Sequence, residues 1–487
     1  MKRILLSAAA FTAVAAVVVS GVTGGQSSKA TSKARPLATA IFDGGSVSRT
    51  AAQDVRAAGA TFVRVVLWWP SVAPEGTTAP AAFDAGNPRD SHYRWQPFDT
   101  TVRNVVAAGL VPIVDVHHAP AWARAKSCPG EAAATCRPTS SALADFATAA
   151  ARRYGGGVRG LPRVRYWQLW NEPNLSIELT PQVANGRPVS PDVYRDMVNA
   201  FARAVHGVHR DNVVVAGGLA PFGGDVNDQS GGVPSQRRVH PLEFMRRFLC
   251  MSAGPKPKPT CGKKVEFDVW AHHPYTYGGP THKALNPDDV SIGDLRKMTS
   301  LLNAADRAGH IRSRGDVPFW VTEFSYDSQP GDPQGLPPAL HARWVSESLY
   351  RMWSDGVSLV TWFLLDDRPF PDDMYQSGLY TLDGQPKPAL RAFRFPFVAF
   401  RQKSGEVRYW GRTPGGARKA VVVEQDRNGW ERVATAEVDD NGIFQGRADV
   451  RGDGAFRARL VNGSDVSEPF SLDVPADYRF CPWGSFC

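Results

Sequence analysis

Two glutamates, Glu172 and Glu323, are the residues of this sequence whose surroundings best suit catalysis. Glu172 lies in the run RYWQLWNEP (165–173) and Glu323 in the run VPFWVTEF (317–324), each at the C-terminal end of a hydrophobic, strand-like segment. Carboxyl groups at the ends of buried parallel strands are where barrel enzymes place their chemistry. A pair of them suits hydrolysis of a glycosidic bond, because one protonates the leaving oxygen while the other attacks or activates water.

The size and composition allow one large domain and a smaller one. The chain has 487 residues, of which 43% are hydrophobic, and its 14 tryptophans can supply both a core and a sugar-binding cleft. The net charge is +9, but no Lys/Arg-rich run or nucleic-acid motif accompanies it, so we expect no nucleic-acid partner. A basic solvated surface is the first interpretation of this charge, and a mild attraction to acidic glycans is the alternative.

The first 25 residues have the pattern of a secretory signal peptide. Lys2 and Arg3 precede an apolar stretch over residues 4–22, and the small residues Thr23, Gly24 and Gly25 follow it. A polar linker over residues 26–36 comes next. The alternative is a retained membrane anchor, but the stretch is short and diluted by alanine and glycine. We therefore expect a secreted, monomeric protein without a membrane partner after cleavage.

Six cysteines fall into three close pairs. An exported chain meets oxidising conditions, so local disulfides are the natural expectation, the last of them closing a tail over residues 476–487. Metal ligation is the rival, but there is no C-x-x-C and no histidine at ligand spacing beside the cysteines. We predict no metal site and no cofactor. The predicted disulfides are Cys128–Cys136, Cys250–Cys261 and Cys481–Cys487.

An alternation of strand and helix patterns runs over residues 37–400. Most of the strand candidates are continuous apolar runs, as expected for parallel strands covered on both faces. Eight of them, each separated from the next by helical patterns, predict an α/β fold of the (β/α)8 TIM-barrel type. An open doubly wound sheet is the rival, but no Gly-rich phosphate loop follows the first strand. The candidates span residues 38–42, 61–67, 111–117, 165–170, 213–217, 267–271, 319–323 and 359–363.

The pattern changes after Phe400. Four short strands, at 406–410, 419–424, 433–438 and 456–461, are separated by turns such as Asp440-Asn441-Gly442. They predict a small antiparallel, sandwich-like β domain over residues 401–475. Its few aromatic residues suit its own core, so we expect it to support the barrel rather than to bind sugar independently.

The barrel segment resembles the retaining glycoside hydrolases of clan A, and is most similar to families 5 (cellulase-like) and 39 (xylosidase-like). The motif that carries this resemblance is Trp170-Asn171-Glu172-Pro173-Asn174. The resemblance implies that Glu172 is the acid/base and Glu323 the nucleophile. The resemblance covers the barrel but not the β domain, and it does not distinguish between families 5 and 39.

The resemblance also implies roles for six other residues. Asn171 would bond the sugar 2-hydroxyl, Arg64 would support the nucleophile, and Tyr275 would bond it. His117 and His273 match the histidines of strands three and six, and Trp362 matches the strand-eight sugar platform. By ordinary electrostatics, Arg64 would keep Glu323 ionised, and ionised Glu323 would raise the pKa of Glu172.

The simpler alternatives concern single residues. A glutamate at a strand end can be a solvated loop residue, and Asp327, Asp366 and Asp367 rival Glu323 at the rim. His118 and His272 compete with their neighbours for the cleft, and Trp362 could fill the barrel. Trp68, Trp69 and Trp122 could line outer subsites or the core.

The sequence therefore predicts a secreted retaining β-glycosidase that acts on a carbohydrate by double displacement, endo-acting in preference to exo-acting. A non-catalytic carbohydrate-binding protein of the cell wall, built on a decayed barrel, is the alternative from another class.

Overall fold

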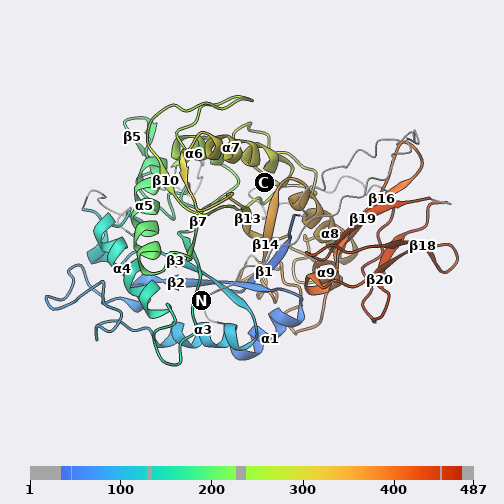
Figure 1. Ribbon diagram of the computed structural model, residues 1–487, viewed down its shortest axis with the longest axis horizontal. Helices are drawn as coiled ribbons and strands as arrows, with labels where there is room; N and C mark the ends of the chain where they lie inside the picture. The colour runs from blue at the N-terminus through green and yellow to red at the C-terminus, as the bar shows by residue number, and fades with distance from the viewer. Residues whose placement is uncertain are drawn as a thin grey trace, which may run out of the picture. The chain divides into compact units, whose positions relative to one another are not determined.

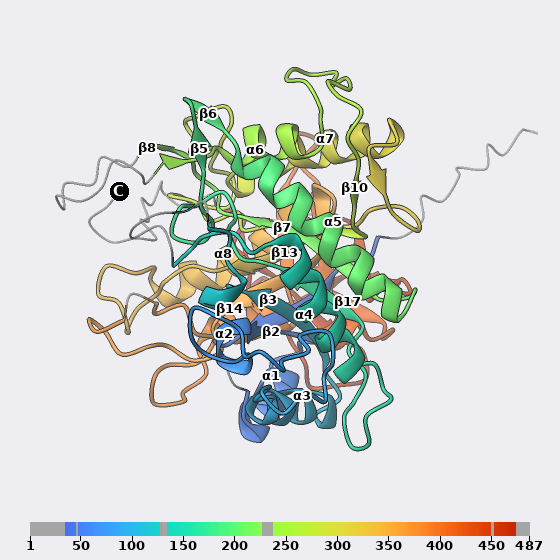
Figure 2. The same ribbon diagram turned by 90° about the vertical axis from the view of Figure 1, so that its left-hand side faces the viewer.

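A closed barrel of eight parallel strands, surrounded by helices, forms the larger part of the protein (Figures 1 and 2). The computed structural model describes residues 35–44, 47–126, 128, 134–225, 237–373, 375–449 and 452–473. The predicted signal peptide, most of the predicted linker and the Cys481–Cys487 tail lie outside these residues. Among the residues described, no helix is long and apolar enough to cross a membrane.

The barrel strands follow one another around the ring in the order β1, β2, β3, β4, β7, β11, β13 and β14, and β14 closes on β1. Every neighbouring pair is parallel. The sequence prediction of eight barrel strands is confirmed, with bounds that differ by no more than two residues at either end. The strands are β1 (Ala38–Phe42), β2 (Phe62–Trp68), β3 (Val111–His117), β4 (Tyr166–Leu169), β7 (Val213–Leu219), β11 (Val269–His272), β13 (Phe319–Phe324) and β14 (Val357–Phe363).

Helices follow the strands and cover the outside of the barrel. Several begin with a proline in the first turn, where the missing N–H costs nothing, and α4 begins with a Thr139 side chain that accepts from the Ala142 N–H. The longer helices are α1 (Arg49–Ala57), α3 (Gln96–Ala107), α4 (Ser140–Arg153), α5 (Ser190–Val208), α6 (Pro241–Phe248), α7 (Leu295–Arg307), α8 (Pro338–Ser354) and α9 (Pro388–Arg394).

Two separate apolar clusters show which way the strand side chains point. A small cluster fills the inside of the barrel, and a much larger one lies between the strands and the helices. Because strand side chains alternate, most strands contribute to both clusters, and β2 and β4 place the partly buried Phe62 and Tyr166 against the inner one. The inner cluster consists of Ala40, Ile113, Val215, Val269, Ala271, Trp320 and Leu359.

Two three-stranded antiparallel sheets follow the barrel, in the orders β15-β16-β19 and β18-β17-β20. The first strand already starts at Phe397, so the β domain begins before the predicted boundary at residue 401. Strands β15 and β19 were not predicted from the sequence. The bounds are β15 (Phe397–Arg401), β16 (Val407–Arg412), β17 (Val421–Asp426), β18 (Trp430–Ala436), β19 (Ile443–Ala448) and β20 (Phe456–Leu460).

Helix α8 is one of the barrel elements against which this β domain packs. Tyr350 and Trp353 of α8 both contact the ring of Trp410, each with ring centroids 5.4 Å apart. The guanidinium of Arg343 lies 3.9 Å from the centre of the Phe470 ring and donates a hydrogen bond to the Ser471 carbonyl. The β domain therefore completes the outer covering of the barrel at this helix.

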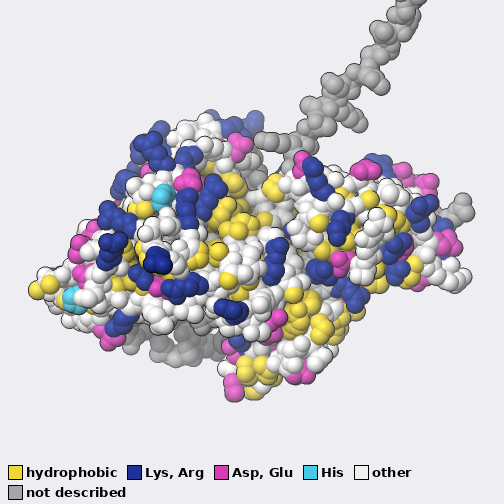
Figure 3. All heavy atoms as spheres, turned by 60° about the horizontal axis from the view of Figure 1, so that its bottom comes forward, with side chains coloured by type: hydrophobic (Ala, Val, Ile, Leu, Met, Phe, Trp, Pro, Cys, Tyr) yellow, Lys and Arg dark blue, Asp and Glu magenta, His cyan; other side chains and the backbone are white. Residues whose placement is uncertain are grey.

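The surface charge is spread over many elements. On the face shown in Figure 3, Lys and Arg side chains occur along most of the molecule, with Asp and Glu between them. This face therefore carries no continuous basic stripe of the kind that follows a nucleic-acid backbone.

Candidate active site

Glu172 is held in an unusual backbone conformation directly after β4. Its φ angle is 38° and that of Trp170 is 69°, both in the left-handed region that costs free energy for residues other than glycine. The Glu172 N–H donates to the Gly218 carbonyl at the end of β7 over 3.0 Å. This bond, together with Pro173, turns the chain so that the carboxyl group enters the barrel mouth.

The end of β7 can adopt this shape only because it is glycine-rich. Gly217 has φ 100°, and a Cβ atom placed on it would lie 2.3 Å from the Ala271 carbonyl oxygen. The register between β7 and β11 shifts just here, between Ala271 and His272. The His273 N–H then donates to the Leu219 carbonyl. The carbonyl groups at the end of β7 thus position both Glu172 and His273.

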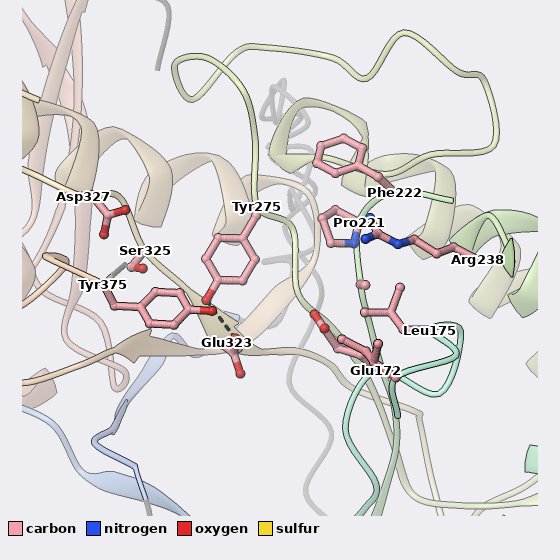
Figure 4. A pocket seen from close by; sticks show the side chains of 12 residues that line it. Glu172, Leu175, Pro221, Phe222, Arg238, Tyr275, Glu323, Ser325, Asp327 and Tyr375 are labelled. Carbon is pink, nitrogen blue, oxygen red and sulfur yellow. Dashed lines mark hydrogen bonds between the residues drawn. The ribbon is translucent and has the colours of Figure 1, made fainter. Parts of the chain in front are cut away.

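Glu323 lies near the end of β13, and two side chains hold its carboxylate. Arg64 Nη1 on β2 is 2.8 Å from Oε2. The Tyr275 hydroxyl, after β11, donates to Oε1 over 2.9 Å, as the dashed line in Figure 4 shows. A carboxylate with both oxygens bonded is fixed in orientation and favoured in its ionised form, as a nucleophile requires.

Arg64 is almost completely buried and connects several strands. Its Nη2 donates to Asp115 of β3 and to Asn171 after β4, each over 2.7 Å. Burial would lower the pKa of Arg64, but the negative charges of Asp115 and Glu323 raise it above its ordinary value. The guanidinium is therefore a permanent cation that fixes Glu323 and Asn171 in relation to one another.

The two glutamates face one another across the barrel mouth. One carboxyl oxygen each of Glu172 and Glu323, together with a ring nitrogen of His273, lie within 4.8 Å of one another. His273 Nδ1 is 3.1 Å from Glu172 Oε1, and its Nε2 is 3.1 Å from the Thr322 hydroxyl. Burial lowers the pKa of His273 to about 3, so its imidazole is neutral at physiological pH.

Glu172 keeps its proton at neutral pH. Burial, and after it the negative charge of Glu178, raise the pKa of Glu172 to about 8. The expected direction of the shift is present, but the carboxylate responsible differs from the predicted one. Sequence reasoning assigned the effect to Glu323, whose charge Arg64 already balances. A carboxyl group that is protonated at working pH can act as a general acid.

Glu178 is a site residue that sequence reasoning missed. It accepts hydrogen bonds from His117 Nε2 over 2.8 Å and from Asn171 Nδ2 over 3.4 Å, and His118 Nε2 lies 3.3 Å from it. Burial would raise the pKa of Glu178, but the hydrogen bonds from His117 and His118 lower it to about 2. The only sequence signal was an acidic residue six positions after Glu172, in a loop without a motif.

The histidine pairs differ in how they face the cleft. Both His117 and His118 bind Glu178, whereas only one of them, His117, was expected to face the cleft. Of His272 and His273, it is His273 that points to the site. The His272 ring bonds the Val290 carbonyl on the outer side of the barrel, and burial lowers the pKa of His272 to about 3.

Two groups of side chains in the described residues have the geometry to hold a metal ion. They are His117, His118 and Glu178, and Glu172, His273 and Glu323, each with ligand atoms within 4.8 Å of one another. The first group is a set of two imidazoles and a carboxylate, which transition metals accept. In both groups, hydrogen bonds among the members already satisfy these atoms, and hydrolysis by two carboxyl groups needs no metal.

A pocket of about 290 Å³ contains the two glutamates. Figure 4 shows Tyr275, Ser325, Asp327 and Tyr375 gathered on the side of Glu323. On the side of Glu172 it shows Leu175, Pro221, Phe222 and Arg238. The pocket is polar and tyrosine-lined at one end, and apolar with a single arginine at the other.

Trp362 does not line this pocket, so its predicted role as a sugar platform is wrong. Its ring is 1% exposed and lies among Phe324, His341 and Phe393, on the helix side of the sheet. Its Nε1 donates to the Ser377 carbonyl over 2.8 Å. The next residue, Phe363, points the other way and contacts Tyr375, which does line the pocket.

The three tryptophans near the rim divide into two core residues and one exposed residue. Trp69 is fully buried against Phe146, and Trp122 is packed on Trp69, so both belong to the core. Trp68 is 42% exposed, and its ring lies 4.4 Å from that of His118. Of the three, Trp68 is the one that can stack on a sugar beside the site.

Two of the predicted disulfides are formed, Cys128–Cys136 and Cys250–Cys261. The first closes a loop after β3. Directly after this loop, the Arg137 N–H donates to the Thr180 carbonyl, on the loop that carries Glu178. The second lies after α6. No described cysteine is free, and the third predicted pair lies outside the described residues.

A parallel eight-stranded barrel with a glutamate after β4 and another on β13 defines a glycoside hydrolase of clan A. The family model described as "Cellulase (glycosyl hydrolase family 5)" matches residues 27–334, more than half of the chain. The chain belongs to this family and is a glycosidase. No curated protein is similar enough to the chain to count as a match.

Several solved structures are similar to the chain at low sequence identity. A family 39 glycoside hydrolase from Bacteroides cellulosilyticus WH2 superposes with a TM-score of 0.50 and 17% identity, covering 88% of this chain and 81% of its own. A family 39 β-xylosidase from Caulobacter crescentus gives 0.46 and 16%, with 80% and 83% covered. A GH5_18 protein from Streptomyces cattleya gives 0.44 and 17%, with 73% and 79% covered.

Proposed function

We propose that the protein is a retaining β-glycosidase that hydrolyses its substrate by double displacement. The observation that carries this proposal is the short separation of Glu172 and Glu323, whose nearest oxygens lie within 4.8 Å. Retaining enzymes place their carboxyl groups about 5–5.5 Å apart, whereas inverting enzymes need about 6.5–9.5 Å to admit a water molecule between them.

The first step follows from the protonation states. Glu323, bonded by Arg64 and Tyr275, attacks the anomeric carbon. Glu172, which holds its proton at neutral pH, transfers that proton to the leaving oxygen. The glycosidic bond breaks as the ester bond between Glu323 and the sugar forms, so the leaving group departs as a neutral alcohol.

The second step reverses these roles. Glu172, now a carboxylate, takes a proton from a water molecule that attacks the anomeric carbon. The ester bond to Glu323 breaks, and the sugar leaves with its original configuration. Asn171, held by Arg64 and Glu178, presents its amide to the sugar, where a hydrogen bond that strengthens in the transition state would accelerate both steps.

The proposed substrate is an oligosaccharide or polysaccharide, cleaved internally by a secreted monomer. Support for an extended binding surface comes from the exposed ring of Trp68 beside His118. The two disulfides suit an oxidising, extracellular environment. Part of the long loop after β7 lies outside the described residues.

Substitution of the two glutamates tests the mechanism. Glu323→Ala should nearly abolish turnover, whereas Glu172→Ala should lose most with poor leaving groups. Azide should rescue Glu172→Ala and yield a β-glycosyl azide, because a small anion can replace the missing base. Glu437→Ala, on the exposed surface of the β domain, is a matched control. A β-glycosyl azide from Glu323→Ala together with an α-glycosyl azide from Glu172→Ala would reverse the assignment, because azide that replaces the nucleophile inverts the configuration.

Product analysis on a panel of aryl β-glycosides and polysaccharides tests the mode of action. Early release of mixed oligosaccharides is the expected result. Release of monosaccharide alone from chain ends would show an exo-acting, xylosidase-like enzyme. Binding without any turnover would favour the non-catalytic alternative.

A further inference from the structure

The two ends of the catalytic pocket differ in charge. The sugar that forms the ester with Glu323 must lie on the side of Glu323, Tyr275 and Tyr375. The residue that leaves must lie on the side of its proton donor, Glu172. Leu175, Pro221, Phe222 and Arg238 line that second side.

Arg238 is the cation of the leaving-group side. It lies on the short strand β9 (Arg237–Arg238), which pairs with β8 (Gly224–Asp225) after the end of β7. Its side chain is exposed, and in Figure 4 the guanidinium extends from β9 towards Pro221. The guanidinium of Arg238 forms no ion pair and no hydrogen bond with the part of the chain that the structure describes.

The charge of Arg238 is close enough to Glu172 to affect the pKa of that carboxyl group. Its positive charge, after that of Arg64, opposes the rise in the pKa of Glu172. Arg64 is already committed to Asp115, Asn171 and Glu323, whereas Arg238 has its hydrogen-bond donors available. A guanidinium in this state is suited to bind a carboxylate or a sulfate with two parallel hydrogen bonds.

The opposite end disfavours an anion. The nucleophile Glu323 lies there, bonded by Arg64. The carboxyl group of Asp327 also lines this end, but burial raises the pKa of Asp327 to about 8, so it adds no negative charge at neutral pH. Asp327 is 6% exposed, and one of its oxygens accepts the Gln376 N–H. A negatively charged sugar at this end would lie against the nucleophile, which costs free energy through like-charge repulsion.

We propose that Arg238 makes the enzyme selective for substrates whose leaving residue carries an anionic group, a carboxylate or a sulfate, while the sugar attached to Glu323 is neutral. This inference rests on the proposed glycosidase function and names its substrate class. The apolar side chains of Leu175 and Phe222 would contact the rest of the leaving residue.

Matched pairs of aryl glycosides test the inference. The neutral sugar is the one that the wild-type enzyme prefers, and the aryl group carries either an anion or its neutral amide at the same position. The pairs are 4-carboxyphenyl with 4-carbamoylphenyl, and 4-sulfophenyl with 4-sulfamoylphenyl. Comparing wild type with variant for each substrate removes the effect of the phenol's own acidity.

Arg238→Gln removes the charge, and Arg238→Lys keeps it. For an anionic leaving group we expect Arg238→Gln to lower kcat/KM about tenfold, mainly through KM, because a charge-assisted hydrogen-bonded pair is lost. The loss on the neutral amide should be much smaller, and Arg238→Lys should keep most of the activity on the anion. Arg408→Gln, which removes an exposed arginine from β16, controls for net charge.

Salt and pH give independent readings. Raising the ionic strength from about 0.01 to 1 M should reduce the wild-type preference for the anion, because the Debye length falls from about 30 to 3 Å. Arg238→Gln should also move the alkaline limb of kcat/KM to higher pH, because removal of a nearby cation raises the pKa of Glu172.

The outcomes separate this inference from the proposed function. A loss confined to the carboxylate pair supports a uronic acid as leaving residue, and a loss confined to the sulfonate pair supports a sulfate ester. Equal losses on anionic and neutral members of both pairs overturn the inference while leaving glycosidase activity established. Absence of turnover on all the glycosides, neutral ones included, overturns the proposed function itself.

Discussion

Arg64 donates a hydrogen bond of 2.7 Å to the side chain of Asn171. The same guanidinium bonds the Glu323 carboxylate through its other terminal nitrogen. The amide that would bind the sugar and the nucleophile that would attack it therefore share one rigid support, although they come from different strands.

Arg64→Lys should lower kcat about 100-fold, because a misplacement of catalytic groups by roughly 1 Å has effects of that size. Lysine keeps the charge but cannot donate to Glu323, Asp115 and Asn171 from one planar group. Steady-state kinetics would measure the loss, with the melting temperature as a check on folding. Activity close to that of the wild type would show that charge alone suffices.

Glu178→Gln should move the alkaline limb of kcat/KM to lower pH. The wild-type limb is expected near the Glu172 pKa of about 8. The ionised Glu178 carboxylate repels the charged form of Glu172, so its removal lets Glu172 lose its proton earlier. Glu178→Asp keeps the charge and is the matched control. An unmoved limb in Glu178→Gln would show that burial alone determines the pKa.

Glu172→Gln should stabilise the protein, and increasingly so as the pH rises. The folded protein holds the Glu172 proton up to about pH 8, whereas the unfolded chain releases it near 4.5. Between these values the folded state binds more protons, so the free energy of unfolding decreases with rising pH. Glutamine cannot titrate and escapes this loss. Thermal unfolding at pH 5 and pH 8 measures it, and a constant difference between the two proteins would contradict the pKa shift.

Trp410→Ala should destabilise the barrel as well as the β domain. Trp410 is 1% exposed between the β domain and Tyr350 and Trp353 of α8. Its truncation should cost about 3 kcal/mol or more. Trp430→Ala is the matched control, because that ring packs on Arg457 within the β domain. Calorimetry should show one transition shifted to lower temperature, and two separate transitions would indicate an independent domain.

The barrel could be predicted from the sequence because its strands are continuous apolar runs that end in polar residues. β3 and β13, for example, end with His117 and with Glu323 and Phe324, and parallel strands bring such ends to one face. The two glutamates could therefore be assigned to one site before any contact was known.

The direction in which a barrel side chain points could not be predicted. A strand buried on both faces has no alternation of apolar and polar residues, so nothing distinguished Trp362, which faces the helices, from Phe363, which faces the barrel. The role of Glu178 depends on distances created by the fold. An isolated acidic residue in a loop carries no local signal of the histidines that it will contact.

The end of β7 locates both Glu172 and His273, through the carbonyl groups of Gly218 and Leu219. A hydrogen bond to the neighbouring strand β7 therefore positions the acid/base Glu172. Arg238, the proposed substrate-selecting residue, lies on β9, so its side chain can change without altering the end of β7. Natural or designed changes of specificity can therefore alter the side chain at position 238, while the end of β7 keeps Glu172 in place.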